Sequence, residues 1–335
     1  MVTSPERVLV TGGAGFIGTL LSHALVSAGY RLTVLDNFST GKLSEVSDLL
    51  NSIHKVQIVR GDCKSAKDLR KALLDARIVF HLAGNPEVRP DRSPPSSWFD
   101  ENIQATYALL EEVRRSKTEI IVFASSSTVY GDAKLMPTPE DYGPLEPISL
   151  YGASKLACEG LISAYCHTYG KTAVILRLAN IVGPTNRHGV IVDFLVQLSA
   201  HPKTLVILGD GRQTKSYLHV EDCISAMLQA LAAAQSGVNV FNVGSEDGIE
   251  VYKVARIVAE EAGFHNVEYK FADGGHGGRG WNGDVKKMLL DVGRLKSAGW
   301  TPRFSSEQSV RRTVRSALQK SISSEVLGQT VSSQQ

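Results

Sequence analysis

The sequence predicts an α/β fold in which a doubly wound parallel sheet is joined to a smaller α/β lobe, and three observations support this. Short apolar runs alternate with helical patterns through the first half of the chain, as they do in parallel sheets covered on both faces. A glycine-rich turn joins the first apolar run to the first helical pattern. Beyond residue 183 the elements shorten and glycine turns become denser, which is typical of a second lobe.

The predicted strands are short, rich in branched residues and apolar on both faces, as buried parallel strands are. They cover residues 8–10, 32–35, 56–59, 78–80, 120–123 and 174–176. Helical patterns lie between them at 16–28, 65–75, 98–116 and 151–169. This alternation forms successive βαβ units and therefore a parallel sheet.

The domain organisation follows from the change of texture at Gly183-Pro184. We expect a cofactor-binding domain over 1–183 and a substrate lobe over 184–320, interleaved with the first domain. Residues 321–335 are rich in Ser and Gln with few apolar anchors, which predicts a disordered tail.

Composition excludes several function classes. The chain has 335 residues, with 36 Lys+Arg against 34 Asp+Glu and a formal charge of +2, so no basic surface for nucleic acid is expected. Its 4 cysteines form neither a CxxC pair nor a Cys/His cluster, which predicts no metal site and a reducing compartment. No apolar run approaches the ~20 residues of a membrane span, and no signal peptide is recognisable. We therefore expect a soluble cytoplasmic protein.

The glycine-rich turn predicts a dinucleotide site. Gly12, Gly15 and Gly18 follow the first strand, and Phe16-Ile17 open the helix. This is where a Rossmann-type sheet needs close backbone approach to a pyrophosphate, whose charge the helix N-terminus stabilises. Asp36 ends the second strand, where a carboxylate binds ribose hydroxyls and repels a 2′-phosphate. The predicted cofactor is therefore NAD.

Polar and small residues after the neighbouring strands extend the predicted cofactor site. They are Asn37, Ser39, Thr40, Gly41, Asp62, Cys63, Leu82, Ala83 and Gly84. Two alternatives stay open here. Asp62 could instead cap the helix that follows, and His81 could be a hydrogen-bonded core histidine.

A tyrosine and a lysine four residues apart form the predicted catalytic pair. Tyr151 and Lys155 share one face of a helix, and a nearby ammonium favours the phenolate form of a tyrosine. The pair suits a proton acceptor for an alcohol whose carbon loses hydride. Ser126 lies in the segment that ends the preceding strand, where its hydroxyl could donate to the substrate oxygen as a carbonyl forms.

These motifs, together with His81-Leu82-Ala83, the SSSTVYG segment at 125–131 and RLANIVGP at 177–184, appear in a familiar order. The chain resembles the extended short-chain dehydrogenase/reductases over about residues 6–320, and within them the NAD-dependent nucleotide-sugar epimerase/dehydratase group. It is most similar to the UDP-glucose (UDP-galactose) 4-epimerases.

The resemblance implies roles for the catalytic residues. Tyr151 would be the base, Lys155 its modulator and a ligand of the nicotinamide ribose, and Ser126 the catalytic serine. The 4,6-dehydratases of the group carry Asp-Glu at the next two positions, whereas this chain has Ser127 and Thr128. Hydroxyl groups there fit an epimerase, which needs no carboxylate to expel a hydroxyl.

The resemblance also implies the substrate contacts. The expected residues are Glu87, Arg89, Ser126, Ser127, Thr128, Tyr151, Asn180, Val190, Lys215, Tyr217, Arg279 and Trp281. Two of them depart from the family pattern. Lys215 replaces an arginine that clamps phosphate, and a lysine offers only a point charge. Arg279 stands two residues earlier than usual in its segment.

The expected function is inversion at C4 of a UDP-hexose, of the UDP-glucose/UDP-galactose type, through a transient 4-keto sugar. The alternatives are a nucleotide-sugar dehydratase, a UDP-glucuronate or UDP-GlcNAc 4-epimerase on the same scaffold, and a non-catalytic dinucleotide sensor. If the assembly resembles the family's, helices around 100–116 and 151–169 would pair across a two-fold axis in a homodimer.

Overall fold

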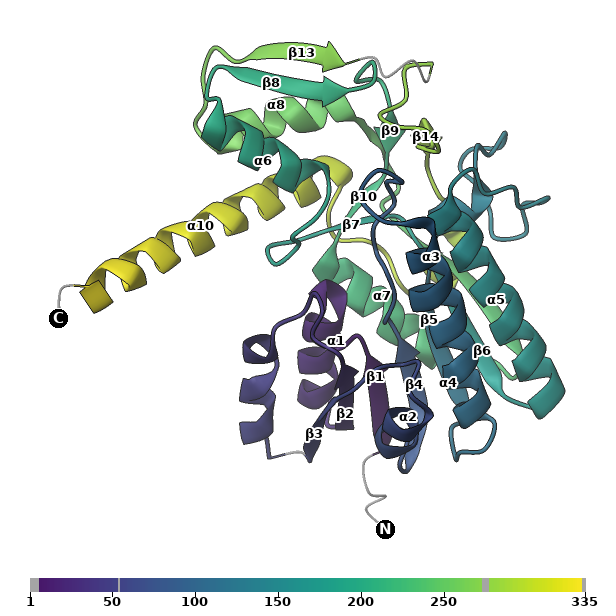
Figure 1. The fold of residues 1–335 in the computed structure, drawn as a ribbon. Helices are drawn as coiled ribbons and strands as arrows, with labels where there is room; N and C mark the ends of the chain where they lie inside the picture. Colours follow the sequence, from purple (N-terminus) through teal and green to yellow (C-terminus); the bar gives the residue numbers. More distant parts are fainter. Residues whose placement is uncertain (1–5, 54, 273–276, 333–335) are drawn as a thin grey trace. The chain divides into compact units, whose positions relative to one another are not determined.

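The computed structural model describes residues 6–53, 55–272 and 277–332, and the chain divides into two compact units (Figure 1). The first unit comprises Met1–Leu178, Ile224–Val243 and Asp291–Thr301. The second comprises Ala179–Cys223, Gly244–Leu290 and Pro302–Gln335. The chain thus leaves the first unit at Leu178, slightly before the expected boundary at 183, and later returns to it twice.

A seven-stranded parallel sheet forms the centre of the first unit, in the order β11-β6-β5-β4-β1-β2-β3. The strands are β1 (Arg7–Thr11), β2 (Arg31–Asp36), β3 (Val56–Arg60), β4 (Ala76–His81), β5 (Ile120–Ser126), β6 (Thr172–Leu178) and β11 (Val238–Val243). The predicted α/β class is confirmed. β11, which comes from much later in the chain, was not among the expected strands.

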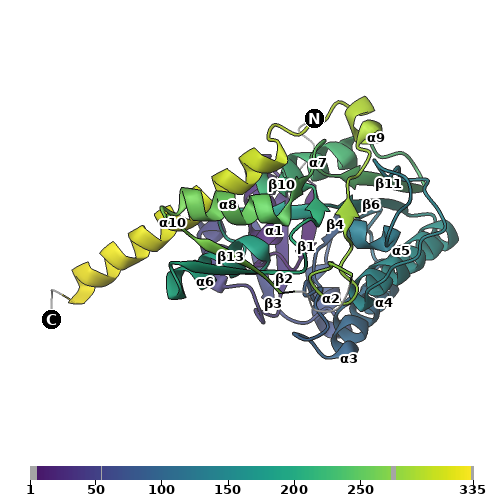
Figure 2. The same ribbon diagram turned by 90° about the horizontal axis from the view of Figure 1, so that it is seen from above.

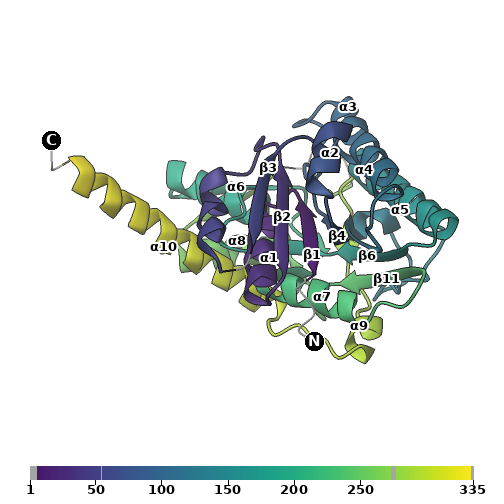
Figure 3. The ribbon, with the colours of Figure 1, turned by 90° about the horizontal axis from the view of Figure 1, so that it is seen from below.

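Helices cover both faces of this sheet, as its apolar strands require. Figures 2 and 3 show α2 (Ala66–Ala72), α4 (Ala105–Val113) and α5 (Leu150–Tyr169) along one face, and α1 (Phe16–Ser27) and most of α7 (Val220–Ala232) along the other. Between the sheet and the first group lies a buried cluster that includes Leu9, Leu35, Leu109, Phe123 and Ile162. Short 3-10 turns complete the unit at η1 (Leu43–Glu45), η2 (Ser47–Asn51) and η4 (Ser127–Tyr130), with the short helix α9 (Gly293–Ser297).

The helix expected over 98–116 is interrupted. It consists of α3 (Pro95–Trp98), a π-helical segment η3 (Phe99–Gln104) and α4. Asn102 lies inside the π-helical segment and is 2% exposed. Its buried side chain bonds to other elements of the unit, and short π-helical turns inside α-helices are frequent at functional sites.

The second unit is built from small sheets and helices. β7 (Asn180–Val182) pairs with β10 (Tyr217–His219), β8 (Thr204–Leu208) pairs with β13 (Glu268–Ala272), and β9 (Thr214–Lys215) lies between β12 (Ile249–Glu250) and β14 (Lys287–Met288). The helices are α6 (Val190–Ala200), α8 (Val251–Glu261) and α10 (Ser306–Ser332). Its core includes Phe194, Leu198, Ile207, Tyr217 and Val258.

The end of the chain differs from the expectation of a disordered tail over 321–335. Helix α10 continues to Ser332, and residues 333–335 lie outside the described part of the chain. The stretch 306–332 contains no proline, so no residue in it removes a main-chain donor from the helix. Among the described residues, none of the helices combines the length and the apolar character that a membrane crossing requires.

A buried ion pair joins α5 to the sheet. Arg177 on β6 donates from Nε and Nη2 to the carboxylate of Glu159 on α5, with a shortest distance of 2.8 Å. Its Nη1 donates to the Tyr130 hydroxyl at 2.9 Å, which donates to Asn242 on β11 at 2.7 Å. Both ionised side chains are almost completely buried, so each depends on the other for its charge to be tolerated.

We expect Glu159→Gln to destabilise the protein by about 3 kcal/mol or more, because it leaves the buried Arg177 charge uncompensated. Urea unfolding measures this change. The matched control is Glu119→Gln, which removes the pair of Arg77 and Glu119, whose side chains are 45% and 57% exposed; its unfolding midpoint should stay close to that of the wild type. Equal effects of the two substitutions would contradict the role given to the buried pair.

Candidate functional site

The β1–α1 turn is shaped for close approach to a ligand. Gly12 has φ +67°, and a Cβ placed there would lie 2.8 Å from the main-chain nitrogen of Ala83. A Cβ at Gly18 would overlap the carbonyl oxygen of Gly12. Helix α1 begins after Gly15, which has no side chain to cap it, so its first amides are open to an anion. Phe16 and Ile17 form the partly buried first turn. The turn therefore fits the pyrophosphate of a dinucleotide.

Asp36 ends β2 and is fixed by main-chain donors. Its Oδ2 accepts from the nitrogen of Ala14 at 2.9 Å and its Oδ1 from that of Phe38 at 2.7 Å. The carboxylate is therefore held beside the glycine turn, with lone pairs left for ribose hydroxyls. Gly41 packs so closely on Ala14 that a side chain there would overlap its carbonyl oxygen. Ser39 and Thr40 are exposed.

The loop after β3 holds the next predicted residues. Asn37 donates to Asp62 Oδ2 at 3.4 Å, and Asp62 Oδ1 accepts from the nitrogen of Lys64 at 2.8 Å. The residue that caps α2 is Ser65, so the alternative reading of Asp62 as the helix cap is wrong. Cys63 is buried, and burial raises the pKa of its thiol to about 12. It therefore contributes packing to this loop rather than a reactive thiolate.

His81 is a core histidine with both ring nitrogens hydrogen-bonded. Nδ1 lies 2.8 Å from the Thr11 hydroxyl and Nε2 lies 3.0 Å from that of Thr106. Burial, together with the charge of Lys155, lowers its pKa to about 3. The ring is therefore neutral at physiological pH, and the alternative reading of this residue is correct.

Leu82, Ala83 and Gly84 follow His81 and line the glycine turn with small surfaces. The nitrogens of Leu82 and Ala83 donate to the main-chain and side-chain oxygens of Thr11 at 3.2 and 3.3 Å. Both amides are thus committed within the protein. A ligand at the glycine turn could therefore make van der Waals contact with this segment but could not accept hydrogen bonds from the nitrogens of Leu82 and Ala83.

Tyr151 and Lys155 lie on the first turns of α5, which Ser149 caps by accepting from the nitrogen of Gly152 at 3.0 Å. Lys155 is 7% exposed and donates from Nζ to the carbonyl oxygen of Ala124 on β5 at 2.9 Å. The same Nζ lies 5.8 Å from the centre of the Tyr151 ring. The ammonium is therefore anchored beside the phenol, as the spacing predicts.

Ser126 ends β5 and begins the short turn η4. Its hydroxyl accepts from the hydroxyl of Thr128 at 2.9 Å and from its nitrogen at 3.2 Å. Ser127 is buried and Thr128 is partly exposed. The first turn of α5 packs tightly on η4, because a Cβ at Gly152 would lie 2.7 Å from the carbonyl oxygen of Thr128. The turn thus brings Ser126 and the start of α5 together.

The buried Asn102 is a residue that the sequence reading missed. Its Oδ1 accepts from the nitrogen of Asn85 at 2.7 Å, and its Nδ2 donates to Ser154 on α5 at 2.8 Å. It therefore connects the loop after β4 to the helix that carries Tyr151. The only local signal was a polar side chain within an apolar helical pattern.

Glu87 and Arg89 are organised by their own loop. The Glu87 carboxylate accepts from the main-chain nitrogen of Arg89 at 2.9 Å, while the Arg89 guanidinium pairs with Asp91 at 3.1 Å. The two side chains thus make separate contacts within the loop. A role for either one in sugar binding stays a prediction.

In the second unit, the structure separates the predicted substrate residues into surface and core. Asn180 on β7 is exposed, and its side chain donates to the carbonyl of Ser216 at 3.3 Å. Val190 opens α6 and is partly exposed. Tyr217 is different: it is 3% exposed within the unit's core, where burial raises the pKa of its phenol. This ring is not presented to a ligand.

Lys215 and Arg279 meet at one carboxylate. Lys215 Nζ donates to Asp284 Oδ1 at 2.7 Å and also to the carbonyl of Val285. Arg279 donates to the main-chain carbonyl of Asp284. Trp281 lies in the same loop and is partly exposed. Lys215, which the resemblance places at the diphosphate, is therefore engaged in an internal ion pair with Asp284.

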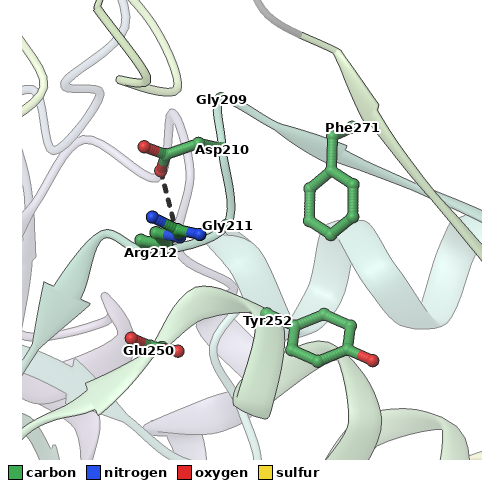
Figure 4. Close-up of a pocket in the computed structure, with 7 residues that line it drawn as sticks. All are labelled: Gly209, Asp210, Gly211, Arg212, Glu250, Tyr252 and Phe271. Atoms are coloured by element: carbon green, nitrogen blue, oxygen red, sulfur yellow. Dashed lines mark hydrogen bonds between the residues drawn. The ribbon is translucent and has the colours of Figure 1, made fainter.

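A pocket of about 500 Å³ lies at the turn after β8 (Figure 4). Its lining is Gly209, Asp210, Gly211, Arg212, Glu250, Tyr252 and Phe271. The rings of Tyr252 and Phe271 lie 5.9 Å apart and form one wall. Gly211 has φ +75°, and a Cβ there would lie 2.6 Å from Phe271. The turn therefore needs glycine to fit against this aromatic wall.

Comparison with known proteins gives consistent results. Residues 8–244 match the family described as the NAD dependent epimerase/dehydratase family. A UDP-glucose 4-epimerase of Azospirillum brasilense is 31% identical over 334 residues, covering 93% of this chain and 91% of that protein. The crystal structure of a UDP-galactose 4-epimerase is 38% identical with a TM-score of 0.82, covering 94% and 99% of the two chains. A UDP-glucuronic acid 4-epimerase from Bacillus cereus, solved with UDP-glucuronic acid and NAD, is 28% identical with a TM-score of 0.84, covering 93% and 99%.

We expect Gly18→Ala to lower the amount of NAD that the purified protein retains, because the new methyl group overlaps the Gly12 carbonyl and displaces the turn. NAD released on denaturation measures this. Gly160→Ala is the control, since a Cβ at this position of α5 meets nothing within 4 Å; it should keep its NAD and raise stability by up to about 1 kcal/mol. Unchanged NAD content in Gly18→Ala would refute the cofactor role of the turn.

Proposed function

Because the chain belongs to the NAD-dependent epimerase/dehydratase family, we propose that it inverts C4 of a UDP-hexose of the UDP-glucose/UDP-galactose type. The chain is a NAD-dependent enzyme of the nucleotide-sugar epimerase group. The finer assignment is supported by the relatives named for UDP-glucose and UDP-galactose. The single observation that carries it is the anchored Tyr151–Lys155 pair beside a β5 terminus that bears hydroxyls instead of carboxylates.

The proposed chemistry at Tyr151 is proton transfer. The phenolate takes the proton of the C4 hydroxyl, and the Lys155 ammonium stabilises that phenolate. NAD, when bound, accepts the C4 hydrogen with its electron pair and later gives it back. Ser126 donates a hydrogen bond to the C4 oxygen as it becomes a carbonyl. Tyr151 then returns its proton to that oxygen when hydrogen is added to the opposite face of C4, so the product is an isomer of the substrate.

The hydroxyls of Ser127 and Thr128 favour epimerisation over dehydration. Loss of a C6 hydroxyl needs an acid to protonate it and a base to take the C5 proton. A serine or threonine hydroxyl at these positions is far too weak an acid for the first step and too weak a base for the second. The same residues argue against a dehydratase as the second candidate function.

The second unit supplies the proposed nucleotide contacts. Arg279 and Asn180 would bind the diphosphate, and the turn from Gly209 to Gly211 would border the nucleoside. The aromatic wall of Tyr252 and Phe271 beside this turn offers a planar base an apolar surface.

We further propose a cytoplasmic homodimer that pairs α4 and α5, where Tyr107 and Tyr169 are 48% and 43% exposed.

We expect Tyr151→Phe to lower kcat by about 10²–10⁴-fold, because it removes the proton acceptor while leaving the ring in place. NAD content should not change. The matched control is Tyr165→Phe on the same helix, whose hydroxyl bonds to Glu111; it should keep full turnover. The rate of isomer formation, measured by NMR, tests whether Tyr151 is the base. Full turnover by Tyr151→Phe would show that another residue accepts the proton.

A panel of UDP-sugars distinguishes the candidate activities. With UDP-galactose and no added NAD, we expect UDP-glucose of unchanged mass. Conversion of only UDP-glucuronate or UDP-GlcNAc would reassign the sugar but keep the C4 chemistry. A product lighter by one water, detected by mass spectrometry, would instead show a dehydratase. The absence of any product with the whole panel would refute the proposed activity.

A further inference from the structure

Lys215 stands where the family resemblance implies a phosphate-binding arginine, yet its contacts lead elsewhere. Its Nζ donates to Asp284 Oδ1 at 2.7 Å and to the carbonyl of Val285. The lysine side chain is 14% exposed and the aspartate side chain 5%. An ammonium held by a buried carboxylate and a carbonyl is committed to both acceptors.

Asp284 organises the loop that carries Arg279. Its Oδ2 accepts from the nitrogen of Gly280 at 3.1 Å, and its main-chain carbonyl accepts from Arg279. One residue thus binds both the backbone next to Arg279 and its guanidinium. Because Lys215 binds the other carboxylate oxygen, it joins this loop to β9.

The C-terminal end of this loop is joined to the rest of the second unit by strand pairing. Lys287 and Met288 of β14 pair with Thr214 and Lys215 of β9. Lys286 lies 3.6 Å from Asp210. The strand pairing fixes the chain after Asp284, and the nitrogen of Asp210 donates to the carbonyl of Gly278 at 3.1 Å just before Arg279. The Lys215–Asp284 pair acts on the part between these two ties. This part includes Arg279 and Trp281.

We propose that Lys215 is a positioning residue, which holds the 279–285 loop through Asp284 so that Arg279 supplies the charge for the substrate diphosphate. The inference rests on the proposed function as a UDP-sugar enzyme. The two bonds of Lys215 to Asp284 and Val285 leave one hydrogen of the ammonium, whereas a forked guanidinium could keep an acceptor and still bind phosphate through two donors. Moving the ammonium to phosphate would leave the buried carboxylate of Asp284 without its counter-charge, with the Gly280 nitrogen as its remaining donor, which is unfavourable.

The proposal predicts a specific consequence of removing the ammonium. In Lys215→Met the carboxylate of Asp284 is unpaired and lies next to Arg279. The guanidinium is the nearest cation of its loop and would turn to this carboxylate, away from a ligand. The loss of diphosphate binding in Lys215→Met is therefore caused by displacement of the Arg279 guanidinium. Arg279→Met already removes this guanidinium, so a second substitution at Lys215 should weaken diphosphate binding little further.

A double-mutant cycle tests this, with UDP and UMP as probes in calorimetry on the full-length protein. We expect Lys215→Met and Arg279→Met each to weaken UDP binding by about 10-fold or more, the scale of one charged hydrogen bond. UMP binding should change less. The double variant should bind UDP no more weakly than Arg279→Met alone, and Asp284→Asn should restore part of the affinity of Lys215→Met. Lys270→Met, at an exposed lysine of β13, is the control.

Multiplicative losses in the double variant would show that Lys215 contacts the diphosphate directly, and would overturn the proposal. A readout without ligand separates it from the proposed function. Trp98 and Trp300 are 2% and 5% exposed, so acrylamide quenching reports mainly on Trp281. We expect Lys215→Met, but not Lys215→Arg, to increase this quenching, and Trp281→Phe to remove the increase. Unchanged quenching overturns the proposal, whereas a wild-type protein that does not bind UDP refutes only the function on which it rests.

Discussion

The contact between Arg177 and Glu159 is the constraint on which the first unit depends most. It ties α5 to β6 inside an interior where neither charge is stable alone, and through Tyr130 and Asn242 it reaches β11. Helix α5 carries Tyr151 and Lys155, so their position follows from this anchor and from the Lys155 bond to Ala124. The position of the proposed catalytic pair therefore depends on the packed sheet as well as on the spacing of the two residues along the helix.

The charge pattern of the molecule is compatible with the proposed binding of two diphosphates by a nearly neutral chain. The cofactor turn relies on glycines and on the first amides of α1, which attract anions without a cationic side chain. In the second unit, Lys215 and Asp284 cancel each other's charge, and Arg279 is the positive side chain of that loop assigned to the substrate. Local groups thus replace the basic surface that the composition lacks.

Patterns that depend on neighbours in sequence could be predicted from the sequence. The strands of the first half, the glycine turn, Asp36 and the Tyr151–Lys155 spacing all belong to this class, and the structure brings them together as expected. Contacts between distant residues could not be predicted. Lys215 and Asp284 are 69 positions apart, and Asn102 and Ser154 are 52 apart. Nothing local to Tyr217 reveals that its ring lies in a core.

The neutral His81 has one more consequence, which concerns the order of the protons around it. The Thr106 hydroxyl donates to Cys158, and the Cys158 thiol donates to the carbonyl of Asn102. Thr106 must therefore accept from Nε2 of His81, whose Nδ1 then accepts from Thr11. These four hydrogen bonds form a series in which each group donates to the next. The last acceptor in the series is the carbonyl oxygen of Asn102. Each donor and acceptor in this series is already used, so exchange of its hydrogens for deuterium would require several groups to turn at once.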